Sequence, residues 1–125
     1  MNITSKSMQS VAIKLIDFLS SKELFSNVQI YAGNKRFSSE KLNSDQIQKR
    51  TKNNNIYYID DDIDITEYIE NADPKTIGLT FEGPLYELIN YEDYDFIYTL
   101  TEKFISEYKL YFDMINSFSI AAYRA

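Results

Sequence analysis

The sequence predicts an α+β fold formed by a single domain over residues 1–125. Two segments, near residues 5–20 and 93–108, have apolar side chains at the three- and four-residue spacing of amphipathic helices. The remaining apolar segments are short, alternate with polar residues and are joined by turn residues. They predict about six short strands in a mostly antiparallel sheet. We expect the two main helices, one N-terminal and one near the C-terminus, to pack on one face of this sheet.

The N-terminal helix is predicted over residues 5–20, with Ser5 or Ser7 as its cap. Its apolar stripe consists of Met8, Val11, Ala12, Leu15, Phe18 and Leu19. Residues 28–38 then predict a hairpin with Gly33-Asn34 as its turn. Glycine at the first central position suits a type II′ turn.

Residues 39–55 are mostly polar and predict a short helix that starts at Asn43 or Ser44 and ends at Arg50, followed by an exposed loop. Residues 56–59 have the composition of a strand. After this strand, Asp64 and Glu67 have the spacing of a capping box.

This capping box predicts a short helix through Glu70. The stretch 76–90 follows it with the clearest strand-to-helix transition in the chain. Ile77, Leu79 and Phe81 alternate as in a strand with one buried face, and Gly78 marks a bulge or a close approach by another segment.

Gly83 and Pro84 then suit the start of a short helix with an apolar stripe of Leu85, Leu88 and Ile89. Asp93 is expected to cap the second main helix, which runs to about Tyr108. The stripe of this helix is Phe96, Ile97, Leu100, Phe104 and Ile105. Residues 110–123 predict a final hairpin with its turn at Asn116 and Ser117.

The composition excludes several kinds of chemistry. The chain has neither cysteine nor histidine, so disulfides, thiol nucleophiles, histidine-based triads and the commonest zinc ligands are all excluded. No apolar run reaches the length of about 18 residues that predicts a membrane span, and we expect a cytoplasmic protein without a membrane partner. The basic run Lys49, Arg50, Lys52 lacks interleaved aromatic residues in an acidic protein, so we predict no direct binding of nucleic acid.

Charge is divided unevenly along the chain. Residues 1–55 contain nine Lys/Arg and four Asp/Glu, whereas residues 56–125 contain four Lys/Arg and fifteen Asp/Glu. The chain also has eleven tyrosines, a residue type that is enriched at protein interfaces. A solvated acidic face explains this pattern without any partner. The alternatives are an acidic docking surface for a basic protein and head-to-tail association of copies through the basic segment 35–52, which makes a homo-oligomer an open alternative.

Our leading hypothesis is a small, non-enzymatic protein that binds a protein partner with a basic surface through residues 57–98. An inhibitor encoded by a phage or mobile element would have this size and acidity. The side chains expected at the partner are Asp60, Asp61, Asp62, Asp64, Glu67, Tyr68 and Glu70.

Two further hypotheses come from other functional classes. One is a small-ligand binding or sequestering protein whose pocket is formed by Gly83, Tyr86, Asn90 and Arg124. The other is a divalent-metal-dependent hydrolase, because alternating Asp60, Asp62 and Asp64 resemble metal-binding carboxylates. We favour a capping loop at this position and predict no catalytic residue, no metal ligand and no cofactor.

Overall fold

An antiparallel sheet organises the structure, a computed structural model that describes residues 5–124 except for the side chains of residues 5–7 and 105–106. Within this part of the chain, seven strands are arranged in the order β3-β4-β2-β1-β5-β7-β6. The strands are β1 (Val28–Ala32), β2 (Lys35–Ser38), β3 (Ile47–Arg50), β4 (Ile56–Asp60), β5 (Ile77–Phe81), β6 (Leu110–Asn116) and β7 (Ser119–Arg124). The predicted α+β class is confirmed, with seven strands in place of about six.

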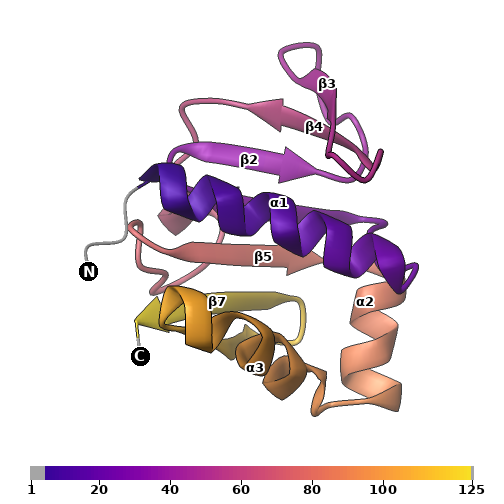
Figure 1. Cartoon of the computed structure of the whole chain (residues 1–125), viewed down its shortest axis with the longest axis vertical. Helices are drawn as coiled ribbons and strands as arrows, with labels where there is room; N and C mark the ends of the chain where they lie inside the picture. Colours follow the sequence, from indigo (N-terminus) through magenta and orange to yellow (C-terminus); the bar gives the residue numbers. More distant parts are fainter. Residues whose placement is uncertain (1–4, 125) are drawn as a thin grey trace.

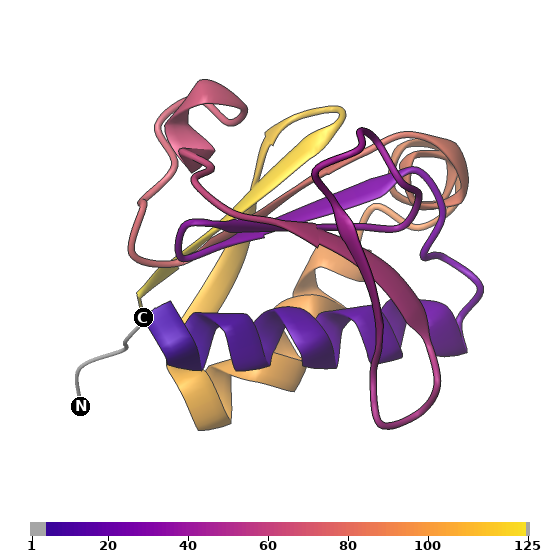
Figure 2. The same cartoon turned by 90° about the horizontal axis from the view of Figure 1, so that it is seen from above.

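The two main helices lie on the same face of the sheet, which we call the helix face (Figure 1; Figure 2). Helix α1 (Ser5–Ser21) packs on β1 and β5, and helix α3 (Phe96–Tyr108) packs on β6. The cause is the apolar stripe of each helix, since burying one large aliphatic side chain stabilises a fold by about 1.5–3 kcal/mol. Fully buried stripe residues include Met8, Val11, Ala12, Leu15, Ile16, Leu19 and Leu100.

Two stripe residues differ from the expectation. Ile16 is fully buried, whereas Phe18 lies at the edge of the core and stacks on Phe96 with 6.1 Å between ring centroids. Ile105 and the caps Ser5 and Ser7 lie outside the described side chains.

The opposite face of the sheet, here called the open face, is covered at one end by residues 61–76. Because β4 and β5 are not neighbours, this segment must cross β2 and β1 to connect them (Figure 2). It contains the 3₁₀ helix η1 (Ile65–Glu67) and packs Ile65 and Ile69 onto the open-face side of the sheet. Asp64 caps η1, as predicted, by accepting a hydrogen bond from the Thr66 amide at 3.0 Å. The helix ends at Glu67, short of the predicted Glu70.

Gly78 of β5 lies beneath this crossing segment. The register of β5 with β1 and β7 is continuous, so Gly78 marks a close approach and not a bulge. A Cβ atom at this position would lie 2.7 Å from Cδ1 of Ile69 and 3.1 Å from the carbonyl oxygen of Ile120. Because glycine has no side chain, the crossing segment can pack directly on β5 at this position.

The predicted helix from Asn43 or Ser44 to Arg50 is wrong, because these residues lead into strand β3. Ile47 is paired with Ile59 of β4 and Arg50 with Ile56. Asn43 accepts a hydrogen bond from the Asp45 amide at 2.9 Å, so it stabilises a turn and not a helix. Pairing with a neighbouring strand outweighs the weak helical pattern.

The loop after β3 is attached to α1 through one carboxylate. Asp17 accepts hydrogen bonds from Thr51 (2.5 Å), Asn53 (3.0 Å) and Asn55 (2.8 Å). The polar run that resembles a free loop in the sequence is therefore held against the helix.

Three smaller differences concern element boundaries. Helix α2 (Gly83–Glu87) begins as predicted and continues into the π-helical segment η2 (Leu88–Glu92). Helix α3 begins at Phe96, whose amide donates to the carbonyl of Asp93. In the last hairpin, Asn116 pairs with Ser119, so Ser117 and Phe118 form the turn.

The hairpin of β1 and β2 has the predicted turn. Gly33 has a φ of 64°, and Asn34 is not among the described residues with positive φ. A positive φ at the first central position alone is what a type II′ turn requires.

Replacing Gly78 by alanine tests the double coverage of β5. We expect Gly78→Ala to lower the free energy of unfolding by about 1–3 kcal/mol, the range for overpacking a core. Ile69→Val, which removes the Cδ1 atom at 2.7 Å, should make the alanine less destabilising. Urea denaturation of the two single variants and the double variant measures this coupling. Purely additive effects would contradict it.

Candidate functional site

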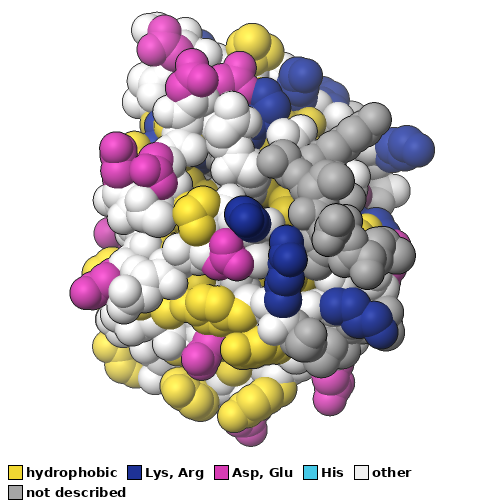
Figure 3. All heavy atoms as spheres, turned by 90° about the vertical axis from the view of Figure 1, so that its left-hand side faces the viewer, with side chains coloured by type: hydrophobic (Ala, Val, Ile, Leu, Met, Phe, Trp, Pro, Cys, Tyr) yellow, Lys and Arg dark blue, Asp and Glu magenta, His cyan; other side chains and the backbone are white. Residues whose placement is uncertain are grey.

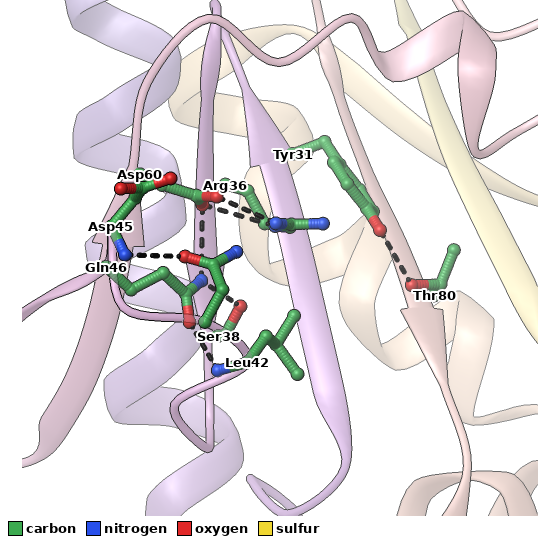
Figure 4. Close-up of polar contacts among 9 residues, drawn as sticks. Tyr31, Arg36, Ser38, Leu42, Asp45, Gln46, Asp60 and Thr80 are labelled. Carbon is green, nitrogen blue, oxygen red and sulfur yellow. Dashed lines mark hydrogen bonds and ion pairs between the residues drawn. The ribbon is translucent and has the colours of Figure 1, made fainter.

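A polar network crosses the open face beside the segment that covers it (Figure 4). At its centre, Arg36 of β2 donates to both carboxylate oxygens of Asp60 at the end of β4, at 3.2 and 2.7 Å. The two side chains are only 10% and 9% exposed. Such a two-point pair is strong and has fixed geometry.

Gln46 connects this ion pair to the loop before β3. Its side-chain nitrogen donates to Ser38 at 3.0 Å and to Asp60 at 3.2 Å, while its side-chain oxygen accepts from the Leu42 amide at 2.6 Å. Gln46 is 3% exposed, and no buried side-chain N or O atom in the described part of the chain lacks a partner. The network is therefore a satisfied structural unit.

Aromatic rings continue the network toward β5. The rings of Tyr31 and Tyr68 stack with centroids 5.0 Å apart, and the Arg36 guanidinium lies 5.5 Å from the Tyr68 centroid. Thr80 donates its hydroxyl hydrogen to Gln29, so the Tyr31 hydroxyl must donate to Thr80. Burial raises the pKa of Tyr31.

The pair of Arg36 and Asp60 also affects acid stability. Burial acts to raise the pKa of Asp60, but hydrogen bonds from Arg36 and Gln46 outweigh it, so the pKa lies below its usual value. For Arg36, burial acts to lower the pKa, and Asp60 more than compensates. For both partners, the pairing therefore outweighs burial and favours the charged form.

The structure uses several of the acidic residues predicted to bind a partner. Asp60 pairs with Arg36, Asp61 pairs with Lys35, and Asp64 caps η1. Tyr68 is 42% exposed above Tyr31. The remaining predicted residues, Asp62, Glu67 and Glu70, are exposed and make no side-chain hydrogen bond or ion pair with any part of the chain that the structure describes.

The acidic stretch 57–98 is divided between two ends of the sheet. Asp60 lies at the end where β5 begins, whereas Glu82 follows the last residue of β5. A strand of this length separates them by about 17 Å. The first end carries side chains of both charge signs (Figure 3).

The second end has a group of carboxylates and tyrosines, and basic residues lie nearby: the ammonium groups of Lys22 and Lys103 lie 5.3 and 4.8 Å from the Phe18 ring, which stacks on Phe96. We call this group the acidic end and define it by the exposed residues Glu82, Glu87, Tyr91, Glu92, Asp93, Tyr94, Asp95 and Tyr98. Tyr91, Tyr94 and Tyr98 are 72%, 63% and 61% exposed. In the described part of the chain, the five carboxylates make no side-chain hydrogen bond or ion pair. These side chains are thus free to contact another molecule.

Three residues of the predicted ligand pocket, Gly83, Tyr86 and Asn90, lie together on the segment formed by α2 and η2, whereas Arg124 lies apart from them. Asn90 donates to the carbonyls of Tyr86 and Ser117, which attaches the helical segment to the last hairpin. Gly83 begins α2 close to Asn27. Arg124 lies at the far end of β7, about 17 Å away by strand length.

The carboxylates are not arranged as a metal site either. Among residues 5–124, no three Asp or Glu side chains are grouped so that they could hold a metal ion. Asp60 and Asp64, two members of the suggested set, are engaged by Arg36 and Thr66.

Within residues 5–124, no helix is long and apolar enough to span a membrane.

Sequence reasoning missed Arg36, Ser38 and Gln46, which are buried polar residues of the open face. Alternation in the predicted hairpin puts Arg36 and Ser38 on the side opposite Phe37, so a charged residue on that strand was a usable signal. Gln46 offered no such signal, because it lies in an irregular loop.

No protein-family model, no curated protein and no solved structure matches this chain.

Removing the buried cation should be strongly destabilising. Arg36→Met leaves Asp60 almost fully buried without its counter-charge, and we expect a loss of about 2–4 kcal/mol in the free energy of unfolding. Lys35→Met is the control, since its pair with Asp61 lies at the surface and should contribute less than about 1 kcal/mol. Urea unfolding at pH 7 measures both. Equal losses would show that the buried pair has no special role.

The same pair predicts a dependence on pH. Because the pKa of Asp60 is lower in the folded than in the unfolded chain, its stabilisation is present above pH about 4 and disappears as the pH falls through the folded pKa. Asp60→Asn should therefore lose less stability between pH 5 and pH 2 than the unmodified protein. Asp62→Asn, an exposed control, should keep the full pH dependence in the same denaturation series.

Proposed function

We propose that this chain is a non-enzymatic binding protein whose acidic end docks against a basic surface of a protein partner. The observation that carries the proposal is the acidic end itself, with five unpaired carboxylates and three tyrosines that are more than 60% exposed. Tyrosine contributes apolar contact area with a polar hydroxyl and is enriched at interfaces, whereas carboxylates attract and orient a positively charged partner.

Four of the other carboxylates support this choice by contrast, whereas Asp62, Glu67 and Glu70 near η1 are also unpaired within the described part of the chain. Asp17, Asp60, Asp61 and Asp64 each bind a described partner within the fold, so neutralising them would change stability as well as binding. The acidic end has no such internal task. Its charge costs the fold local repulsion, which a basic partner would relieve.

Occupation of the partner's basic surface is the mode of action that we propose. If that surface normally binds nucleic acid, the carboxylates take the positions of phosphates, and the chain acts as an inhibitor. A phage or mobile element as the source remains part of this proposal.

The test compares two triple variants with the same change in charge and residue type. One is Glu87→Gln, Glu92→Gln, Asp95→Asn at the acidic end. The control is Glu67→Gln, Glu70→Gln, Asp62→Asn near η1. Proteins captured by the tagged chain from its native cells are identified by mass spectrometry, and their association is then measured with purified components at low and high salt.

We expect the first triple variant to associate about tenfold more slowly at low salt and the control to differ by less than about twofold. Replacing Tyr91, Tyr94 and Tyr98 by alanine should speed dissociation, because aromatic anchors act mainly after encounter. The proposal fails if the captured partner associates with the first triple variant as fast as with the unmodified protein.

A further inference from the structure

A hollow of about 380 Å³ opens on the open face directly beside the acidic end. It lies where β1 begins and β5 ends, next to the turn between β6 and β7. The residues that matter for its chemistry are Gln29, Glu40, Leu42, Thr80, Glu82 and Phe118. We call it the Leu42–Phe118 hollow. Its volume is at the lower end of the range for small-ligand pockets, so it suits a single side chain.

The apolar walls are exposed but held in place. Leu42 is 48% exposed and Phe118 is 50% exposed. The Leu42 amide is bound by Gln46, as shown in Figure 4, and the Phe118 amide donates to Asn116 at 3.0 Å. The carbonyl of Phe118 also accepts from the Phe81 amide at 2.9 Å. These bonds fix the backbone at both walls, so only the side chains lose conformational freedom when the walls are covered.

The polar groups of the hollow are mainly acceptors. Glu40 accepts from the Asn27 amide through one oxygen at 2.7 Å, which orients the carboxylate. Glu82 is exposed and makes no side-chain hydrogen bond in the described part of the chain. The described residues that line the hollow include two glutamates and no lysine or arginine. An aromatic ring, an alkyl wall and two carboxylates together favour a long cationic side chain.

We propose that the Leu42–Phe118 hollow receives an arginine side chain of the protein that docks on the acidic end. This inference rests on the proposed function and specifies what the partner must present. Arginine fits better than lysine because its planar guanidinium can stack on Phe118 while it forms paired hydrogen bonds to a carboxylate. Glu82 belongs to both surfaces, so an arginine bound here joins the hollow to the acidic end.

The probe for this proposal is the peptide acetyl-Gly-Arg-Gly-amide, titrated into the full chain and followed by NMR. We expect chemical-shift changes at Gln29, Thr80 and Phe118 with a dissociation constant on the order of millimolar, as suits one side chain. The isosteric citrulline peptide has no charge and should cause no saturable change. Equal binding of the two peptides, or changes centred elsewhere, would overturn the proposal.

Matched variants separate insertion from long-range attraction. Glu82→Gln and Phe118→Ala should each weaken the arginine peptide about three- to fivefold, the effect of a partly exposed ion pair or ring contact. Glu92→Gln makes the same charge change outside the hollow and should alter affinity less than about twofold. Equal effects of Glu82→Gln and Glu92→Gln would mean that the peptide is only attracted by net charge. Phe118 lies in an exposed turn, and we expect its variant to fold, which circular dichroism checks.

This proposal and the proposed function can fail separately. If binding of a captured partner depends on Glu87, Glu92 and Asp95 but is unchanged by Glu82→Gln and Phe118→Ala, docking on the acidic end is supported and the arginine site is contradicted. If the peptide binds in the hollow while binding of the captured partner is unaffected by the acidic-end variant, the arginine site is supported and the proposed function is contradicted.

Discussion

Strand β5 is buried on both faces, and the arrangement of the other elements depends on this. On the helix face, Ile77, Leu79 and Phe81 join the core beneath the helices. On the open face, Gly78 lies beneath Ile65 and Ile69 of the crossing segment. Burial of the open face of β5 requires glycine at position 78, where the crossing segment comes closest. It also requires the connection from β4 to pass over β2 and β1 before it reaches β5. The crossing segment in turn covers only one part of the open face and leaves the rest polar.

The uncovered part of the open face is stabilised by paired charge in place of apolar packing. Arg36, Asp60 and Gln46 satisfy one another there, and Tyr68 covers the guanidinium. This use of Asp60 distinguishes two groups of carboxylates in an acidic protein. Three of the six carboxylates from Asp60 to Glu70 are bound within the fold, whereas the five carboxylates of the acidic end have no internal partner among the described residues.

The local patterns in the sequence predicted most of the fold. Helical spacing predicted α1 and α3, alternation predicted β5, and Gly33-Asn34 predicted the first turn. Strand β3 was missed because its pairing with β4 and the attachment of its loop to Asp17 are contacts between distant residues. The candidate site was predicted less well for the same reason. The order of residues along the chain could not show that Asp60 and Glu82 lie at opposite ends of β5. It also could not show that Arg36 neutralises Asp60.

The central position of β5 also affects how the sheet can form. The hairpins β1–β2, β3–β4 and β6–β7 each join strands that are close in sequence, whereas β5 pairs only with β1 and β7, both far from it along the chain. Closing these two long loops is entropically slow, and sheets dominated by such contacts fold on the order of milliseconds to seconds. We therefore expect β5 to gain its two neighbours after the hairpins exist. Until then the inner edges of β1 and β7 have unpaired backbone groups, and the partly folded chain is most prone to aggregate at that stage.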